Sequence, residues 1–216
     1  MTGGDLESYH ENPDRLLLLS TIFSYIFQSL DAMAYLSHKH IMHRDLAVRN
    51  CLLNDTYEKL KLNDFGLSRE TNKDYEYISE TNPQLPFRWH PLETLVQGFT
   101  DKGDIWSFGI LIWDMFERGR DLYDGMGLVA LRTFLYDGGR LAQPTNCPDE
   151  LYQIMKRCWN RHPENRPNFD VLQIDIKNVF EQIKANGPYS LNKSIECNNF
   201  IEIINPNYVY EKPNSL

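Results

Sequence analysis

Cysteine is scarce in this chain of 216 residues, and no Cys-x-x-Cys pair occurs in it. Disulfide frameworks and cysteine-bound metal clusters depend on such close spacing, so the pattern predicts free thiols in a reducing compartment. The histidines show no metal-ligand spacing either. The four cysteines are Cys51, Cys147, Cys158 and Cys197.

Long apolar runs are also absent. The longest, at 16–27, is interrupted by Ser20, Thr21 and Ser24, and it is shorter than the roughly 20 residues that cross a bilayer. Met1 is followed by Thr-Gly-Gly-Asp, without the basic and apolar regions of a signal peptide. We therefore expect a soluble chain. Any membrane association of the parent protein is expected to come from an upstream segment outside these residues.

The chain has no excess of positive charge. Its formal net charge is −8 and its pI is about 5.2, which argues against a nucleic-acid or membrane-surface binder, since both need basic patches to hold phosphates. An enzyme that handles phosphate is still allowed, because bound magnesium can supply the positive charge. We expect no nucleic-acid partner.

What is present is the composition of one ordinary globular domain, 42% hydrophobic and 24% charged. Dense apolar residues predict a long helix over 16–36. Two short apolar runs at 51–53 and 60–62 flank Asn-Asp-Thr and predict a small β-hairpin. Further helices are predicted over 104–117, 126–136, 149–160 and 168–184.

Two segments lack this regularity. Residues 67–86 are polar and aperiodic, which predicts a long loop, and loops of this length inside compact domains are usually functional. After residue 184 the composition shifts to Asn, Ser and Lys with scattered aromatics. We expect one helical domain over 1–184 and a flexible tail over 185–216, with a short strand at 200–204.

The strongest chemical signal lies at 43–50, where the sequence is His-Arg-Asp-Leu-Ala-Val-Arg-Asn, and at 64–66, where it is Asp-Phe-Gly. Phosphoryl transfer needs a carboxylate to accept the proton of the attacking hydroxyl, and oxygen ligands to hold magnesium against a triphosphate. The predicted hairpin starts and ends on one side, so it can bring Asn50 and Asp64 together. Both motifs at this spacing make chance occurrence a poor explanation.

These two motifs resemble the catalytic loop and the metal-binding loop of protein kinases. The resemblance implies a mainly α fold, the helical C-terminal lobe of a kinase with a small hairpin, and it implies ATP and Mg²⁺ as cofactors. Asp45 is then the catalytic base, supported by His43, Arg44, Arg49 and Asn50. Asn50 and Asp64 are the implied metal ligands, and the implied nucleotide contacts are Asp64, Leu52 and Asp5.

The resemblance extends over roughly 1–184. The segment Leu-Pro-Phe-Arg-Trp at 85–89 resembles the substrate-binding segment of tyrosine kinases, which implies that Pro86, Arg88 and Trp89 bind the protein substrate. Asp104 matches a residue that braces the catalytic loop. Glu93 and Arg166 match a buried ion pair of the family, and Trp106 and Trp159 are expected in the core.

Three features favour tyrosine over serine or threonine as the phosphate acceptor. Serine/threonine kinases usually place Lys two positions after the catalytic Asp, where this chain has Ala47. Arg49 directly before Asn50 resembles receptor-type tyrosine kinases, in particular the hepatocyte-growth-factor-receptor and Axl-like families. The segment at 85–89 is the third feature. The expected setting is the cytoplasmic side of a single-pass plasma-membrane receptor.

Several tyrosines are candidate modification sites. Tyr75 and Tyr77 occupy the position of activation-loop phosphosites in receptor kinases, and a phosphate there can pair with Arg44. The tail contains Asn-Pro-Asn-Tyr ending at Tyr208, and then Tyr210. An Asn-Pro turn presents the tyrosine that follows it, so phosphotyrosine-binding adaptors are expected partners, although so short a motif also arises by chance.

No Gly-x-Gly-x-x-Gly motif occurs in the sequence, and we expect the β-rich N-terminal lobe of a kinase to be absent from these residues. Residues 1–6 resemble the stretch after the interlobe hinge, where Asp5 either touches the ribose or caps the next helix. Little activity is expected from residues 1–216 alone. A binding or docking lobe is the alternative to an enzyme. A small-molecule phosphotransferase is a third hypothesis, which the segment at 85–89 disfavours.

Overall fold

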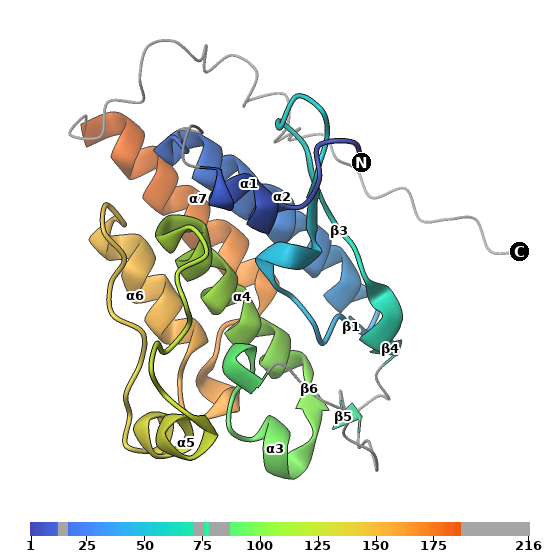
Figure 1. Cartoon of the computed structure of the whole chain (residues 1–216), viewed down its shortest axis with the longest axis vertical. Coiled ribbons are helices and arrows are strands. Elements are labelled where there is room, and N and C mark those ends of the chain that lie inside the picture. The colour runs from blue at the N-terminus through green and yellow to red at the C-terminus, as the bar shows by residue number, and fades with distance from the viewer. Residues whose placement is uncertain (13–16, 71–75, 78–86, 187–216) are drawn as a thin grey trace, which may run out of the picture.

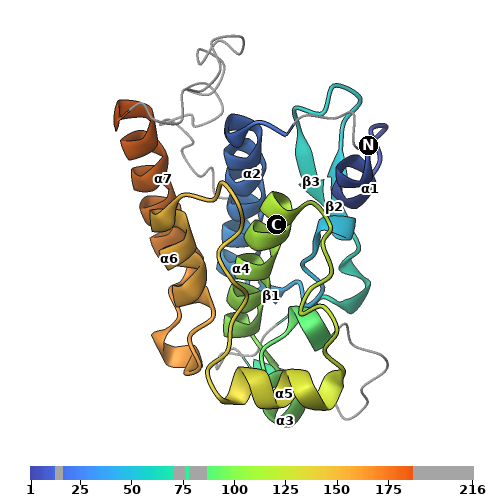
Figure 2. The ribbon, with the colours of Figure 1, turned by 60° about the vertical axis from the view of Figure 1, so that its left-hand side comes forward.

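Four helices in mutual contact form the centre of the molecule (Figures 1 and 2). In the computed structural model, which describes residues 1–12, 17–70, 76–77 and 87–186, α2 packs on α7 and α4, and α6 packs on both of these. Their amphipathic or wholly apolar patterns explain this, because each must bury a face against a neighbour. The helices are α2 (Leu19–His38), α4 (Asp101–Glu117), α6 (Asp149–Cys158) and α7 (Phe169–Asn186).

Helix α4 is the most buried element. Every residue from Gly103 to Met115 is buried, as expected of a helix that is apolar on all sides. Most of its buried polar side chains are hydrogen-bonded, as buried polar groups usually are, although Nε1 of Trp106 has no partner among the described residues. Ser107 Oγ, for example, donates to the backbone carbonyl of Trp89 at 2.8 Å.

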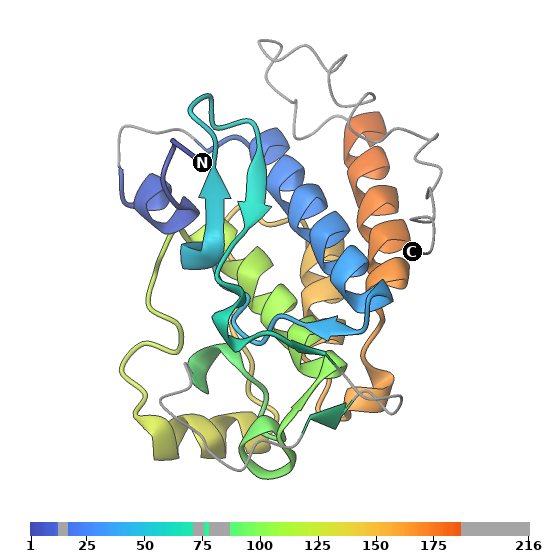
Figure 3. The ribbon, with the colours of Figure 1, turned by 90° about the vertical axis from the view of Figure 1, so that its right-hand side faces the viewer.

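The predicted hairpin is confirmed. Strands β2 (Cys51–Leu53) and β3 (Leu60–Leu62) pair antiparallel and lie beside α2 (Figure 3). Gln28 of α2 bonds the hairpin at two points, donating to the carbonyl of Glu58 at 3.0 Å and accepting from the N–H of Leu60 at 2.8 Å. The hairpin is therefore fixed to the helical core.

The remaining strands form two short antiparallel pairs. Strand β1 (Ile41–Met42) pairs with β4 (Arg69–Glu70), and β5 (Glu76–Tyr77) pairs with β6 (Phe99–Thr100). Two of these strands thus lie within 67–86, where the sequence predicted only a loop. Among the described residues each sheet has two strands, so the expectation of a mainly α fold with a small hairpin is confirmed.

Three shorter helices complete the described part: α1 (Leu6–Glu11), α3 (Thr94–Gln97) and α5 (Leu128–Tyr136). Helices α1 and α3 were not predicted, because six and four residues are too few to show a helical period. Short 3₁₀ turns occur at Val48–Asn50, Phe65–Leu67, Phe87–Trp89 and Pro163–Asn165.

Element boundaries differ modestly from the predictions. Helix α2 begins at Leu19, three residues after the predicted start, and α7 continues to Asn186. The expected strand at 200–204 lies outside the described residues, as do Tyr208 and Tyr210. Within the described residues, none of the helices has both the length and the apolar character needed to cross a membrane.

The expected ion pair and core tryptophans are confirmed. Arg166, whose side chain is fully buried, pairs with Glu93, and Trp106 and Trp159 are 2% and 1% exposed. An Arg–carboxylate pair in the interior is tolerated when the remaining donors are also used. Arg166 meets this condition in part, because it also donates to the carbonyls of Asn160 and Lys102.

Gly109 of α4 provides a test of this packing. A β-carbon there would lie 2.6 Å from Nε1 of Trp159 and 2.9 Å from Cβ of Cys158. We expect Gly109→Ala to lower the free energy of unfolding by about 1–3 kcal/mol, because overpacking forces neighbours apart. Gly103→Ala on the same helix is the control, since its β-carbon would meet only Thr94 Oγ1 at 3.9 Å. Denaturant unfolding measures both, and equal stabilities would contradict the packing described.

Candidate functional site

The segment 43–50 connects β1 to β2 and is buried at its centre. Three consecutive apolar residues, Leu46, Ala47 and Val48, are at most 1% exposed, and they anchor the loop in the core. Residues of a loop are usually exposed, so this degree of burial is the reason that the polar residues around it hold a defined position.

Asp104 of α4 fixes the start of this loop. Its carboxylate accepts the backbone N–H of His43 at 2.7 Å and that of Arg44 at 2.9 Å, as the sequence resemblance predicted. Arg44 has a φ of 68°, a left-handed conformation that a non-glycine residue adopts only when its surroundings hold it. Burial raises the pKa of Asp104 to about 6, and the two N–H donors act in the opposite direction.

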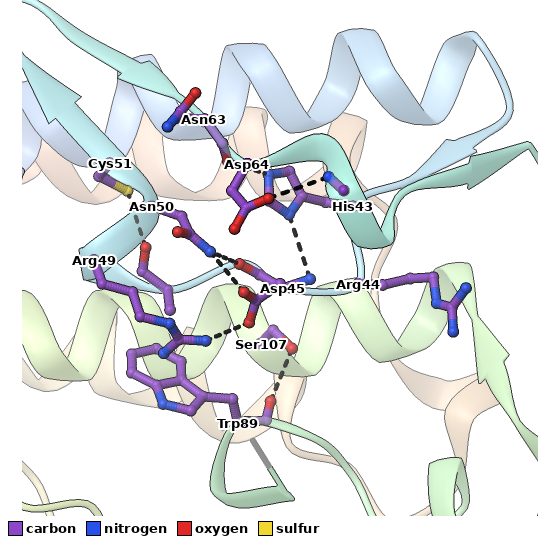
Figure 4. A network of polar contacts seen from close by, with 12 residues as sticks. His43, Arg44, Asp45, Arg49, Asn50, Cys51, Asn63, Asp64, Trp89 and Ser107 are labelled. Atoms are coloured by element: carbon purple, nitrogen blue, oxygen red, sulfur yellow. Dashed lines mark hydrogen bonds and ion pairs between the residues drawn. The ribbon is translucent and has the colours of Figure 1, made fainter. Parts of the chain in front are cut away.

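Asp45 is held by donors on both carboxylate oxygens (Figure 4). The Asn50 Nδ2 group donates to its Oδ2 at 2.8 Å and to its backbone carbonyl at 2.7 Å. The guanidinium of Arg49 pairs with Oδ1. The Asp45 side chain is 12% exposed, so a carboxylate of fixed orientation reaches the surface here.

Arg49 is itself positioned by an aromatic ring. Its guanidinium lies 5.5 Å from the centre of the Trp89 ring, within the range of a cation–π interaction. The Trp89 ring is 9% exposed. Arg49 therefore has one side on an aromatic surface and its tip on Asp45.

Asp64 follows the hairpin on the other side of the site. Asn63 donates its N–H to the carbonyl of Asn50 at 2.8 Å, which extends the hairpin pairing and brings Asp64 to the neighbourhood of Asn50 (Figure 4). Asp64 has a φ of 59°, its carboxylate accepts the N–H of Gly66 at 3.2 Å, and the residue is exposed.

His43 connects the two segments. The N–H of Asp45 donates to His43 Nδ1 at 3.3 Å, so the ring proton is on Nε2, which faces the carbonyl of Asn63 at 3.2 Å. The ring also packs on Phe65 with 5.1 Å between centres. Burial lowers the pKa of His43, which favours the neutral ring that this bonding requires. The buried His43 ring thereby contacts the backbone of Asp45 on one side and the neighbours of Asp64 on the other.

The oxygen atoms available at this site suit a magnesium ion bound together with phosphate. Because the Asn50 amide nitrogen is used on Asp45, its oxygen is left as an acceptor. Asp64 is exposed and makes no ion pair with a basic side chain of the described residues. Mg²⁺ typically takes one or two protein oxygen ligands and completes its shell with water and substrate phosphates. The described residues contain no cluster of three or more acidic, His or Cys ligands, consistent with such a shared site rather than an all-protein one.

The structure gives Asp5 a capping role. Its carboxylate accepts the N–H and the hydroxyl of Ser8, at 2.7 and 3.0 Å, at the start of α1. Asp5 also pairs with Leu52 in an isolated β-bridge, so two of the three residues predicted to contact the nucleotide are neighbours. Of the two roles expected for Asp5, the cap is seen, and contact with a ribose stays a prediction.

The predicted substrate segment is described only in part, because Pro86 lies outside the described residues. Arg88 directs its guanidinium to the backbone carbonyls of Leu122, Tyr123 and Met126. It therefore holds the loop before α5 in place. Trp89 lies under Arg49. Direct contact of either residue with a protein substrate stays a prediction.

Arg44 lies beside β6, the strand that pairs with the segment holding Tyr77. Its guanidinium is 3.8 Å from the centre of the Phe99 ring, and Phe99 is paired with Tyr77 in the β5–β6 ladder. The backbone of Tyr77 is thus one strand away from Arg44. Tyr75 lies outside the described residues, and phosphorylation of either tyrosine stays a prediction.

Two contributors escaped the sequence analysis. Gln28, as described above, fixes the hairpin, and Asp114 is a buried carboxylate on α4 that accepts the N–H of Gly119 at 3.1 Å. Burial raises the pKa of Asp114 to about 7, Glu7 adds to the shift, and Arg49 opposes it. Asp114 had one signal in the sequence, because it interrupts the apolar run at 108–116. Gln28 had none.

The raised pKa of Asp114 predicts a pH-dependent stability. A carboxyl whose pKa is higher in the folded state favours folding while it is protonated, and this contribution is lost as pH rises through about 7. Between pH 4 and pH 8 the free energy of unfolding of the wild type should fall by roughly 2–4 kcal/mol relative to that of Asp114→Asn, because asparagine cannot ionise.

Denaturant unfolding of both proteins at matched pH values measures this difference, and comparing the pair cancels the contributions of all other titrating groups. Parallel pH profiles would show that Asp114 titrates normally in the folded protein.

The comparison with known families agrees with the site geometry. The model of the family described as protein tyrosine and serine/threonine kinase matches residues 1–176. The match covers every described element of the site, from Asp5 to Asp114.

Proposed function

Because the chain belongs to the protein tyrosine and serine/threonine kinase family, we propose that it provides the catalytic lobe of a protein-tyrosine kinase that uses ATP and Mg²⁺. One observation carries the proposal. A buried loop and a hairpin place Asp45, Asn50 and Asp64 around the same space, with Asp45 held on both oxygens (Figure 4).

Asp45 is the proposed base. A base must lie within hydrogen-bond reach of the proton that it accepts, and the Asp45 carboxylate is partly exposed while the backbone of its loop is fixed. Arg49 and Asn50 limit its rotation, so the carboxylate faces an incoming hydroxyl in one orientation. Such positioning is the main contribution of a protein to phosphoryl transfer.

Asn50 and Asp64 are the proposed ligands of the metal. When bound, Mg²⁺ neutralises charge on the transferred phosphate. The chain's part is to aim an amide oxygen from the loop and a carboxylate from the hairpin at one place. The bond from Asn63 N–H to the Asn50 carbonyl, 2.8 Å long, sets their separation.

Tyrosine is the proposed acceptor. Ala47 carries no charge, whereas serine/threonine kinases usually have Lys at this position. In this chain the cation beside Asp45 is Arg49, whose guanidinium pairs with Oδ1 of Asp45. Protein substrates with an accessible tyrosine are therefore the proposed partners.

Residues 1–216 alone are proposed to transfer phosphate slowly. They contain no glycine-rich loop motif. Phosphoryl transfer depends on groups that clamp the phosphates. The activity test therefore uses the longest natural polypeptide that contains these residues.

A binding lobe is the second candidate function. Phe65, directly after the proposed metal ligand, is 48% exposed, and Leu52 on the hairpin is only partly buried. Exposed apolar groups around one site indicate contact with another protein surface. Stable folding together with very weak nucleotide binding would favour this candidate.

The proposed setting is the cytoplasmic side of a single-pass plasma-membrane receptor, on the resemblance of the Arg49–Asn50 arrangement. Tyr208 and Tyr210 are the proposed attachment points for phosphotyrosine-binding adaptors. Both lie outside the described residues, so these proposals depend on the sequence alone.

Substitution of Asp45 tests the proposed reaction. Asp45→Asn should lower the rate of phosphate transfer to tyrosine by about 10²–10⁴-fold, because the amide cannot accept the hydroxyl proton. Asp55→Asn, at the exposed tip of the hairpin, is the matched control and should leave the rate unchanged.

The measurement is transfer of labelled γ-phosphate from ATP, followed by separation of phosphotyrosine, phosphoserine and phosphothreonine. Label found only on serine or threonine would overturn the tyrosine assignment and leave the kinase assignment in place. Equal rates for Asp45→Asn and the wild type would overturn the role of the site.

A further inference from the structure

Helix α5 presents an apolar face that is not used in the core. Leu131 and Leu135 point inward and are 2% and 3% exposed, whereas Val129 and Tyr136 are 78% and 61% exposed. Residues three, four or seven positions apart share a helix face. The outer face therefore carries the residues Leu128, Val129, Arg132, Thr133 and Tyr136.

This face borders a hollow of about 500 Å³, a size typical of binding sites. Four residues of α5 and Leu92 line it: Leu92, Val129, Arg132, Thr133 and Tyr136. Arg161 lies at its edge, with the guanidinium 4.4 Å from the centre of the Tyr136 ring. The hollow thus combines apolar walls with two cations, on a chain whose net charge is −8. An apolar segment with an acidic residue would complement it.

The chain itself contains such a segment. Residues 200–204 are Phe-Ile-Glu-Ile-Ile, the densest apolar stretch after residue 186. In an extended strand alternate side chains share a face, so Phe200, Glu202 and Ile204 would face one way. The pattern is apolar–acidic–apolar over roughly 13 Å. On α5 the pattern of Val129, Arg132 and Tyr136 is apolar–cationic–apolar over roughly 10 Å.

The connecting segment can extend beyond the length of α7. Helix α7 ends at Asn186, and thirteen residues separate it from Phe200, which can span up to roughly 43 Å. Helix α5 lies at the end of the bundle where α7 begins (Figure 1). The tether must therefore run back along α7, whose 18 residues measure roughly 27 Å.

We propose that residues 200–204 bind the hollow of α5 within the same chain, with Glu202 paired to Arg132 and the flanking apolar side chains on Val129 and Tyr136. A short tether gives the segment a millimolar effective concentration, so contacts that would be weak between separate molecules suffice. This docking covers apolar surface that the described residues leave exposed. It is independent of the proposed kinase activity.

Hydroxyl-radical footprinting of the full 216-residue chain tests the docking. Tyr136 and Tyr35 are matched reporters, 61% and 53% exposed. With the segment bound, oxidation of Tyr136 should be about threefold or more below that of Tyr35. In the double variant Phe200→Ser/Ile204→Ser, the oxidation rates of Tyr136 and Tyr35 should become similar.

A charge exchange tests the pairing itself. Glu202→Arg and Arg132→Glu should each raise Tyr136 oxidation about two- to fivefold, the range of a partly exposed ion pair. The double variant, which restores opposite charges, should return it toward the wild-type value. Glu211→Arg, in the same tail but outside 200–204, is the control and should change nothing.

Three outcomes would overturn the proposal. The first is equal oxidation of the two tyrosines in the wild type. The second is protection of Tyr136 that is unaffected by every change at 200–204, which would indicate a different occupant. The third is protection that appears only with dimers in light scattering, because the segment would then bind a second copy of the chain.

Discussion

Two hydrogen bonds accepted by one buried carboxylate set the geometry of the site. Asp104 accepts the N–H groups of His43 and Arg44 and so attaches the loop to the most buried helix of the molecule. A charged acceptor makes these bonds stronger than ordinary backbone pairs. The strained backbone of Arg44 and the orientation of Asp45 both depend on them. The partly exposed side chains of this loop are therefore held in place through α4.

The second half of the site depends on a different anchor. Asp64 and Asn50 lie at the open end of the hairpin. Each of its strands has three residues, and so short a hairpin would be unstable alone. Its stability comes from α2, where Gln28 bonds the hairpin backbone and Tyr25 donates to the carbonyl of Tyr57 at 2.6 Å. Two helices thus position the two halves, and His43 joins them through Asn63 and Phe65.

The sequence predicted the elements whose signals are local. The two short apolar runs at 51–53 and 60–62 predicted the hairpin, and its two strands predicted that Asn50 and Asp64 come together. It could not predict which partners the polar side chains take when those partners are distant in sequence. Arg88 is an example, since its three carbonyl acceptors lie 34 to 38 residues away. Gln28 is another, because nothing in an amphipathic helix distinguishes it from a solvated glutamine.

Amide hydrogen exchange at His43 and Arg44 tests the central claim most directly, namely that α4 holds the loop as part of the core. Amides in a surface loop exchange through local opening, whereas those tied to the core exchange only through global unfolding. The account predicts that both amides of the 216-residue chain exchange as slowly as those in the middle of α4. Exchange as fast as that of the hairpin tip at Asp55 and Thr56 would show that Asp104 does not fix the loop, and would contradict the account.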